Sequence, residues 1–250
     1  AAIFLFLSLL FRANWPGTWR QFTHIAFVGL LMHAFYLNCT FIALDYGVPI
    51  SLAALIYGLQ PIITLFIVSF LLHSHISSAQ WAGVFLGFLG LILVLYDKLA
   101  FNEAKLVPVL ILVFGLFCIT TGTIYQRRFC SAMNLLTGNF IQVFVGGVVT
   151  GIAAFYFESM IVTWNISFIT ALIWMILIVS LGAHTLLLFM LQQNQVAKVS
   201  SLLYLTPPTA SVMAYFMFDE LLSALAIAGV GVTVIGVALI MHGPTNKQAL

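Results

Sequence analysis

Two histidines stand inside long apolar stretches, where an ionisable side chain is costly to keep. His33 lies at the centre of residues 23–44, and Tyr36 follows it on the same helical face. His184 lies in the second half of residues 166–190, with Trp174 roughly along its face. Such groups are functional candidates by default, and histidine can carry a proton near neutral pH. A neutral, hydrogen-bonded histidine is an equally good interpretation of each.

A second set of candidates combines prolines with polar residues at helical spacing. Proline has no N–H, so it frees the carbonyl four residues earlier and bends the helix. In lipid, a free carbonyl is tolerated only against protein or a water-lined cavity. One-sided rows of such residues along a helix therefore either line a pathway or form hydrogen bonds with neighbouring helices. We call each row a stripe. The first stripe, in residues 50–72, holds Tyr57, Gln60, Pro61 and Thr64, and the second, in residues 197–218, holds Tyr204, Pro207, Pro208 and Ser211.

The composition indicates that these candidates lie in a membrane. Of 250 residues, 63% are hydrophobic and only 6% are charged, whereas about 25% are charged in a soluble domain. That is too little polar surface for a protein surrounded by water. A net charge of +2 gives no reason to expect nucleic acid as a partner. The cysteines Cys39, Cys118 and Cys130 lie in or beside apolar runs, so we interpret them as packing residues and expect no metal or other cofactor.

The apolar runs predict an all-α membrane protein, because a spanning helix needs about 20 apolar residues and every backbone group needs a partner inside lipid. Residues 1–11 are too short to span, and we interpret them as the end of a longer, truncated helix. Eight runs are long enough to span: 23–44, 50–72, 78–96, 106–126, 136–157, 166–190, 197–218 and 222–242.

The basic residues predict the orientation. If residues 1–11 end in the cytoplasm, six of the eight Lys and Arg residues lie inside, as the positive-inside rule requires. The tail at residues 244–250 is then cytoplasmic, and all six acids fall outside. The six inside residues are Arg12, Arg20, Arg127, Arg128, Lys198 and Lys247, and the two outside are Lys98 and Lys105.

Residues 59–93 and 205–239 match at a constant offset of 146, most tellingly at glycine and proline. The offset makes residues 1–11 the equivalent of the end of 136–157 and pairs His184 with Asn38. Two repeats of five helices follow, and because five is odd the second is inverted. Inverted repeats are common in secondary transporters, whose sites lie between the copies near mid-membrane. The matches are Leu59/Leu205, Pro61/Pro207, Phe70/Phe216, Ser77/Ser223, Gly83/Gly229 and Gly90/Gly236. The pairs Gly83/Gly87 and Gly147/Gly151 predict close helix packing.

Two stretches resemble a known family. "SSLLYLTPPTASVMAYFMFDELLS" followed by "GVGVTVIGVALI" is similar to the end of the second repeat in the drug/metabolite transporter superfamily, EamA type. "LAALIYGLQPIITLFIVSF" is similar to the equivalent part of the first repeat. The resemblance implies a ten-helix transporter of the bacterial inner membrane. It implies repeats at residues 1–98, lacking helix 1 and part of helix 2, and at 104–243. It also makes Glu220 a family marker and helix-end anchor, with Ser74 in the matching place.

We therefore expect a secondary transporter that exports or exchanges a small polar, amino-acid-like metabolite by alternating access. Its partners would be the lipid bilayer, the substrate and, as the candidate coupling ion, protons. A nucleotide-sugar or sugar-phosphate exchanger is the alternative in the same superfamily, although it needs mid-membrane Lys or Arg, and here both are near helix ends. An intramembrane enzyme or a receptor is the alternative from another class. An enzyme needs a buried catalytic pair or metal set.

Overall fold

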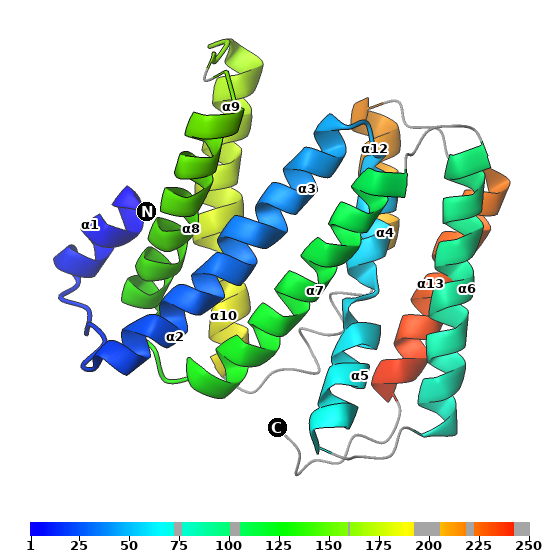
Figure 1. Ribbon diagram of the computed structural model, residues 1–250, viewed down its shortest axis with the longest axis horizontal. Coiled ribbons are helices and arrows are strands. Elements are labelled where there is room, and N and C mark those ends of the chain that lie inside the picture. Colours follow the sequence, from blue (N-terminus) through cyan, green and yellow to red (C-terminus); the bar gives the residue numbers. More distant parts are fainter. Residues whose placement is uncertain (73–76, 101–105, 160, 193–205, 219–222, 243–250) are drawn as a thin grey trace. The chain divides into compact units, whose positions relative to one another are not determined.

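The computed structural model describes residues 1–250 except 73–76, 101–105, 160, 193–205, 219–222 and 243–250, and the regular elements of the described part are all helices (Figure 1). Two of them, η1 and η2, are π-helical. The helices are α1 (Ala2–Leu10), α2 (Trp19–Gly29), η1 (Leu30–Phe35), α3 (Tyr36–Asp45), α4 (Ile50–Gly58), α5 (Gln60–Leu72), α6 (Ser78–Ala100), α7 (Leu106–Phe129), α8 (Leu135–Phe157), α9 (Ile166–Trp174), η2 (Met175–His184), α10 (Thr185–Gln192), α12 (Thr206–Phe218) and α13 (Ala224–His242).

The described helices agree with the predicted all-α class. Seven of the eight predicted runs coincide with helices of the described part, some of them with two or three consecutive elements, and the run at 197–218 lies partly outside the described residues. The organisation as eight spans in two inverted repeats stays a prediction. Among the described residues, five stretches are long and apolar enough to cross a membrane: Trp19–Asp45, Ile50–Ile67, Leu106–Phe129, Leu135–Phe157 and Ile166–Leu187. Shorter apolar helices cover Ser78–Val94 and Ala224–Ile240.

The chain forms two compact units. Unit 1 comprises residues 1–35 and 122–199, and unit 2 comprises residues 36–121 and 200–250. Each unit therefore draws segments from both predicted repeats. Side chains from the two repeats can consequently meet inside a single unit.

The two π-helical segments fall at corresponding positions of the predicted internal repeat. Adding the offset of 146 to η1 gives residues 176–181, which fall inside η2 (Met175–His184). Long π-helical stretches are rare, and π turns are frequent at functional sites. The same unusual geometry therefore occurs at equivalent places in the two predicted repeats.

In unit 2, α6 and α13 pack as an antiparallel pair through glycines. A Cβ added at Gly83 would lie 2.5 Å from the carbonyl oxygen of Gly236, and one at Gly229 would lie 2.8 Å from that of Gly90. Close approach of this kind is what small residues allow in membrane helices. At the offset of 146, Gly83 corresponds to Gly229 and Gly90 to Gly236, so the two contacts correspond to each other. An inverted repeat predicts this relation.

Local hydrogen bonds and one glycine explain the turn between α3 and α4 in unit 2. α3 ends where Gly47 adopts a positive φ of 84°. The Gly47 N–H donates to the carbonyl of Leu44, and the Val48 N–H donates to that of Ala43, which is the Schellman pattern of a helix end. The turn reverses the chain before α4.

The span that contains α4 and α5 is interrupted beside Pro61. α4 ends at Gly58, and α5 begins at Gln60. Pro61 thus occupies the first turn of α5, where a missing N–H costs least. Pro207 and Pro208 lie in α12 (Thr206–Phe218), and the residues before Thr206 lie outside the described part.

In unit 1, α8 runs parallel to α2 and η1. A Cβ added at Gly29 would lie 2.7 Å from the Cα of Gln142, and one at Gly146 would lie 2.5 Å from the Cβ of His33. Residue numbers rise together along both helices, so their directions agree. The predicted packing at Gly147 and Gly151 was wrong: a Cβ there would meet no described atom within 4 Å. Gly146, one position earlier, faces the neighbouring helix instead.

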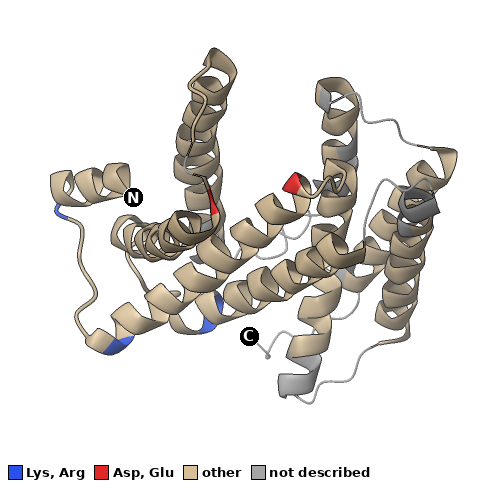
Figure 2. Cartoon of the chain, turned by 45° about the horizontal axis from the view of Figure 1, so that its top comes forward, with Lys and Arg blue, Asp and Glu red and all other residues tan. Residues whose placement is uncertain are grey.

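The charged residues in the described part of unit 1 lie near helix ends or in loops, as Figure 2 shows. Arg20 lies in the first turn of α2, while Arg127 and Arg128 lie in the last turn of α7. His24 Nδ1 lies 2.6 Å from the Tyr125 hydroxyl, which holds the end of α7 against α2. Glu158 follows α8 at its other end, about 35 Å from its start at 1.5 Å per residue.

Candidate functional site

The π-helical segments bring His33 and His184 into contact inside unit 1. Their ring centroids are 4.9 Å apart, and the ring planes are inclined by 77°. The Nε2 atom of each ring is buried and has no hydrogen-bond partner. The sequence identifies each histidine separately as a functional candidate, but it does not predict that the two rings are in contact.

Two amides of α8, Asn139 and Gln142, are fully buried beside this pair. The Gln142 Nε2 donates to Gln126 Oε1 at 2.7 Å, and the Asn139 Nδ2 donates to Thr185 Oγ1 at 3.4 Å. The carbonyl oxygens, Gln142 Oε1 and Asn139 Oδ1, are buried without partners. In each amide, the nitrogen therefore donates a hydrogen bond, while the oxygen accepts none.

We name His33, Asn139, Gln142 and His184 the histidine–amide cluster. His33 contacts His184 and packs against Gly146, about one turn beyond Gln142 on α8. Asn139 binds Thr185, the residue that follows His184. Sequence reasoning missed the two amides. Their spacing with Gly146, at positions i, i+3 and i+7, places all three on one face of an apolar helix, and this was the available signal.

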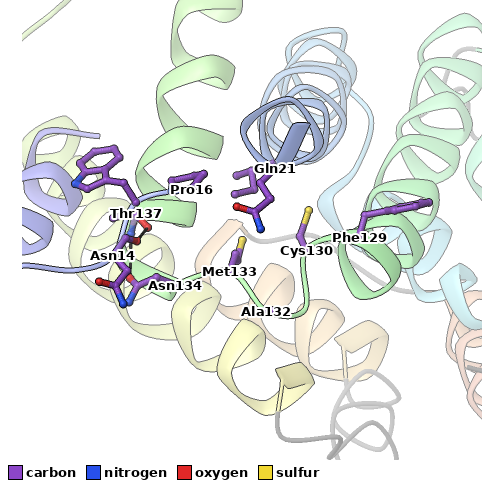
Figure 3. A pocket seen from close by; sticks show the side chains of 11 residues that line it. Asn14, Pro16, Gln21, Phe129, Cys130, Ala132, Met133, Asn134 and Thr137 are labelled. Atoms are coloured by element: carbon purple, nitrogen blue, oxygen red, sulfur yellow. Dashed lines mark hydrogen bonds between the residues drawn. The ribbon is translucent and has the colours of Figure 1, made fainter. Parts of the chain in front are cut away.

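A pocket of about 290 Å³ lies at the arginine end of unit 1 (Figure 3). In Figure 3, Gln21 from α2 and the sulfur-bearing side chains of Cys130 and Met133 converge on it. The Met133 sulfur also accepts from Gln126 Nε2 at 3.5 Å and lies 3.8 Å from Gln142 Nε2. Contacts therefore lead from the pocket through two glutamines to the histidine–amide cluster. The lining residues are Asn14, Trp15, Pro16, Gln21, Ile25, Phe129, Cys130, Ala132, Met133, Asn134 and Thr137.

Unit 2 contains a separate group of predicted residues. Tyr36 and Tyr57 form an edge-to-face pair with centroids 4.8 Å apart. The Tyr57 hydroxyl lies 2.7 Å from Thr40 Oγ1, and a Cβ on Gly115 would lie 2.8 Å from that hydroxyl. The absence of a side chain at Gly115 therefore makes room for the Tyr57 hydroxyl.

The positions of the other predicted pathway residues do not test their proposed roles, which stay predictions. Thr64 Oγ1 donates to the carbonyl of Gln60 at 2.8 Å, within α5. Trp174 lies on α9 and is 58% exposed. Ser211, Pro207 and Pro208 belong to α12 by their backbone alone. Tyr204 and Glu220 lie outside the described residues.

Comparison with known proteins identifies the family. The model of the EamA-like transporter family matches residues 1–96 and 106–242. The chain belongs to this family. It is therefore an integral membrane protein and a membrane transporter, and the matched segments fall within the two predicted repeats.

Two relatives from Escherichia coli strain K12 illustrate the EamA-like family. An uncharacterised inner membrane transporter, YedA, is 25% identical over 245 residues, which cover 97% of this chain and 78% of the relative. A probable amino-acid metabolite efflux pump is 21% identical over 220 residues, which cover 84% of this chain and 73% of the relative. The chain thus resembles transporters over nearly its whole length.

Cys130 gives the pocket a native chemical reporter. Its side chain is 2% exposed, and burial raises the pKa of its thiol to about 11. Only the thiolate attacks an alkylating reagent. In a variant with Cys39→Ser and Cys118→Ser, we expect N-ethylmaleimide to react slowly at pH 7 and about tenfold faster per pH unit up to pH 10. Unfolded protein, as the control, should level off near pH 8.5. The same plateau in folded protein would contradict the buried position.

Proposed function

We propose that the protein exports or exchanges a small polar, amino-acid-like metabolite through unit 1. The observation that carries this proposal is the histidine–amide cluster, a buried set of polar groups without a fixed charge. Neutral hydrogen-bonding groups suit a zwitterionic or weakly charged substrate, which must be released as readily as it is bound. The relative named as a probable amino-acid metabolite efflux pump supports the same substrate class.

The pocket is the proposed entry to this site. It lies at the end of unit 1 that carries Arg20, Arg127 and Arg128, the end that the positive-inside rule assigns to the cytoplasm. A substrate in the pocket would meet Met133 first and the bonded pair Gln126–Gln142 next. Opening this glutamine pair would connect the pocket with the histidine–amide cluster. Closing it behind the substrate supplies one half of an alternating-access cycle.

His33 and His184 are the proposed proton carriers. All Asp and Glu residues of the chain lie at or beyond helix ends in the predicted topology, so histidine is the titratable group at mid-depth. Two imidazoles in contact cannot both hold a charge cheaply, because like charges disfavour each other. We therefore expect the pair to carry a single proton in one step of the cycle.

Reconstitution tests the substrate class. The full chain in proteoliposomes should accumulate radiolabelled amino acids in counterflow, with rates that change when a pH gradient is imposed. Liposomes without protein give the background, and a sugar phosphate serves as the competing substrate. Counterflow of the sugar phosphate without any amino acid would contradict the proposal.

The orientation of unit 1 has its own test. With the native cysteines replaced by serine, a cysteine at Glu158 should react with a membrane-impermeant maleimide from outside the cell. A cysteine at Arg128 should react only after the inner face is opened. The reverse pattern would place the pocket on the outer side of the membrane.

A further inference from the structure

We propose that the histidine–amide cluster recognises a primary ammonium group. This inference rests on the proposed transport of amino-acid-like metabolites and names the substrate group that the cluster binds. The site is formed by His33 of η1, by Asn139 and Gln142 of α8, and by His184 of η2. The two histidine rings are also the proposed proton carriers, whereas the open oxygens of Asn139 and Gln142 have no other role in the proposed function.

The free atoms of the two amides are both acceptors. The Asn139 nitrogen donates to Thr185, and the Gln142 nitrogen donates to Gln126, so both amino groups are engaged. Asn139 Oδ1 and Gln142 Oε1 are buried without a partner. A buried carbonyl oxygen without a donor loses its bond to water and gains nothing in return. Both oxygens therefore need a ligand that supplies N–H or O–H groups.

The histidines extend this set of acceptors. In a neutral imidazole, one nitrogen donates and the other accepts. The open atom on His33 and on His184 is Nε2 in both cases, which accepts when the proton is on Nδ1. The cluster then offers two amide oxygens and two ring nitrogens as acceptors. An ammonium group has three N–H donors and no acceptor, so it complements this arrangement.

A carboxylate or phosphate fits the same place poorly. These groups carry only acceptor oxygens when ionised, and they would face Asn139 Oδ1 and Gln142 Oε1 without a donor between them. Both amides are 0% exposed, so water cannot screen the repulsion. The cluster also lacks an acidic residue, so an ammonium would be held by neutral dipoles and could leave again.

Three matched probes test this recognition. L-leucine carries both ionised groups, isoamylamine is leucine without the carboxylate, and 4-methylpentanoate is leucine without the amine. We expect leucine and isoamylamine to raise the Tm of the purified full chain, and 4-methylpentanoate to leave it unchanged. Equal stabilisation by the amine and the acid, or none by any probe, would overturn the proposal.

Substitutions locate the binding. Asn139→Leu should weaken isoamylamine binding about tenfold or more, since it removes a hydrogen bond to a charged group. Asn139→Asp keeps the oxygen, can accept from Thr185, and should bind the amine at least as tightly as the native chain. Thr233→Val is the control for a buried polar change in unit 2, where the Thr233 hydroxyl donates to the Gly229 carbonyl within α13. Unchanged amine affinity in Asn139→Leu would also overturn the proposal.

Transport separates this inference from the proposed function. Absent leucine flux in the native chain, together with intact isoamylamine binding, would contradict amino-acid transport and leave the ammonium site standing. Normal leucine flux in Asn139→Leu would contradict the ammonium site and leave transport standing. If Asn139→Leu does not fold, Asn139→Asp and the three probes on the native chain decide the question.

Discussion

Replacing His33 by alanine is expected to lower proton-driven transport at least tenfold, which corresponds to about 1.4 kcal/mol of barrier. The substitution removes one of the two rings in contact, whose centroids are 4.9 Å apart. It also removes a titratable group at mid-depth in the predicted topology. His184→Ala should have a similar effect, because either ring alone lacks its partner. The measurement is uptake into proteoliposomes with and without an imposed pH gradient.

A glutamine at position 33 separates proton transfer from hydrogen bonding. His33→Gln keeps a polar side chain but cannot titrate, so it should retain substrate exchange and lose the response to a pH gradient. His24→Ala is the matched control, because His24 binds the Tyr125 hydroxyl at the arginine end of unit 1. Gradient-driven uptake that survives both His33→Ala and His184→Ala would refute the histidine carriers.

Adding a single methyl group at Gly90 is expected to destabilise the protein by about 1–3 kcal/mol, the usual range for overpacking. A Cβ there would collide with the Thr233 side chain and with the carbonyl of Gly229. Backbone cannot move aside as a flexible side chain can, so α6 and α13 must separate. Thermal unfolding of purified Gly90→Ala in detergent should give a lower Tm than the native chain.

Position 231 provides the matched comparison. Gly231 lies on α13 as well, but a Cβ there would meet no described atom within 4 Å. Alanine is favoured over glycine in a helix by about 1 kcal/mol, so Gly231→Ala should be neutral or stabilising. Gly236→Ala, the repeat equivalent of Gly90→Ala, should destabilise as Gly90→Ala does. Equal Tm changes at positions 90 and 231 would contradict the packing of α6 on α13.

The helices were predictable because the length and apolar character of each run depend on local sequence alone. Residues 106–126 and 136–157, for example, correspond to α7 and α8 within a few residues. The π-helical form of η1 and η2 was not predictable, since it depends on how neighbouring helices pack. The repeat offset nevertheless relates the two segments.

The site was only half predictable for a related reason. His33 and His184 stand out because an ionisable group is expensive in an apolar helix. Asn139 and Gln142 carry no charge, so they are inconspicuous in residues 136–157. The contact between the two rings depends on the register of helices that are distant in sequence. That register is a property of packing, and no single stretch of sequence encodes it.

The wide turns at η1 and η2 each contain one residue more than an α-helical turn. A π turn closes its hydrogen bonds five residues apart instead of four, so an α turn can reform on one side while the wide turn moves along by one position. Such a step would turn the residue that the wide turn passes by about 100° around the helix axis, because an α-helix has 3.6 residues per turn. His33 and His184 both lie in these segments. Each histidine therefore occupies a stretch of chain that can turn its side chains toward or away from the other without unfolding a helix.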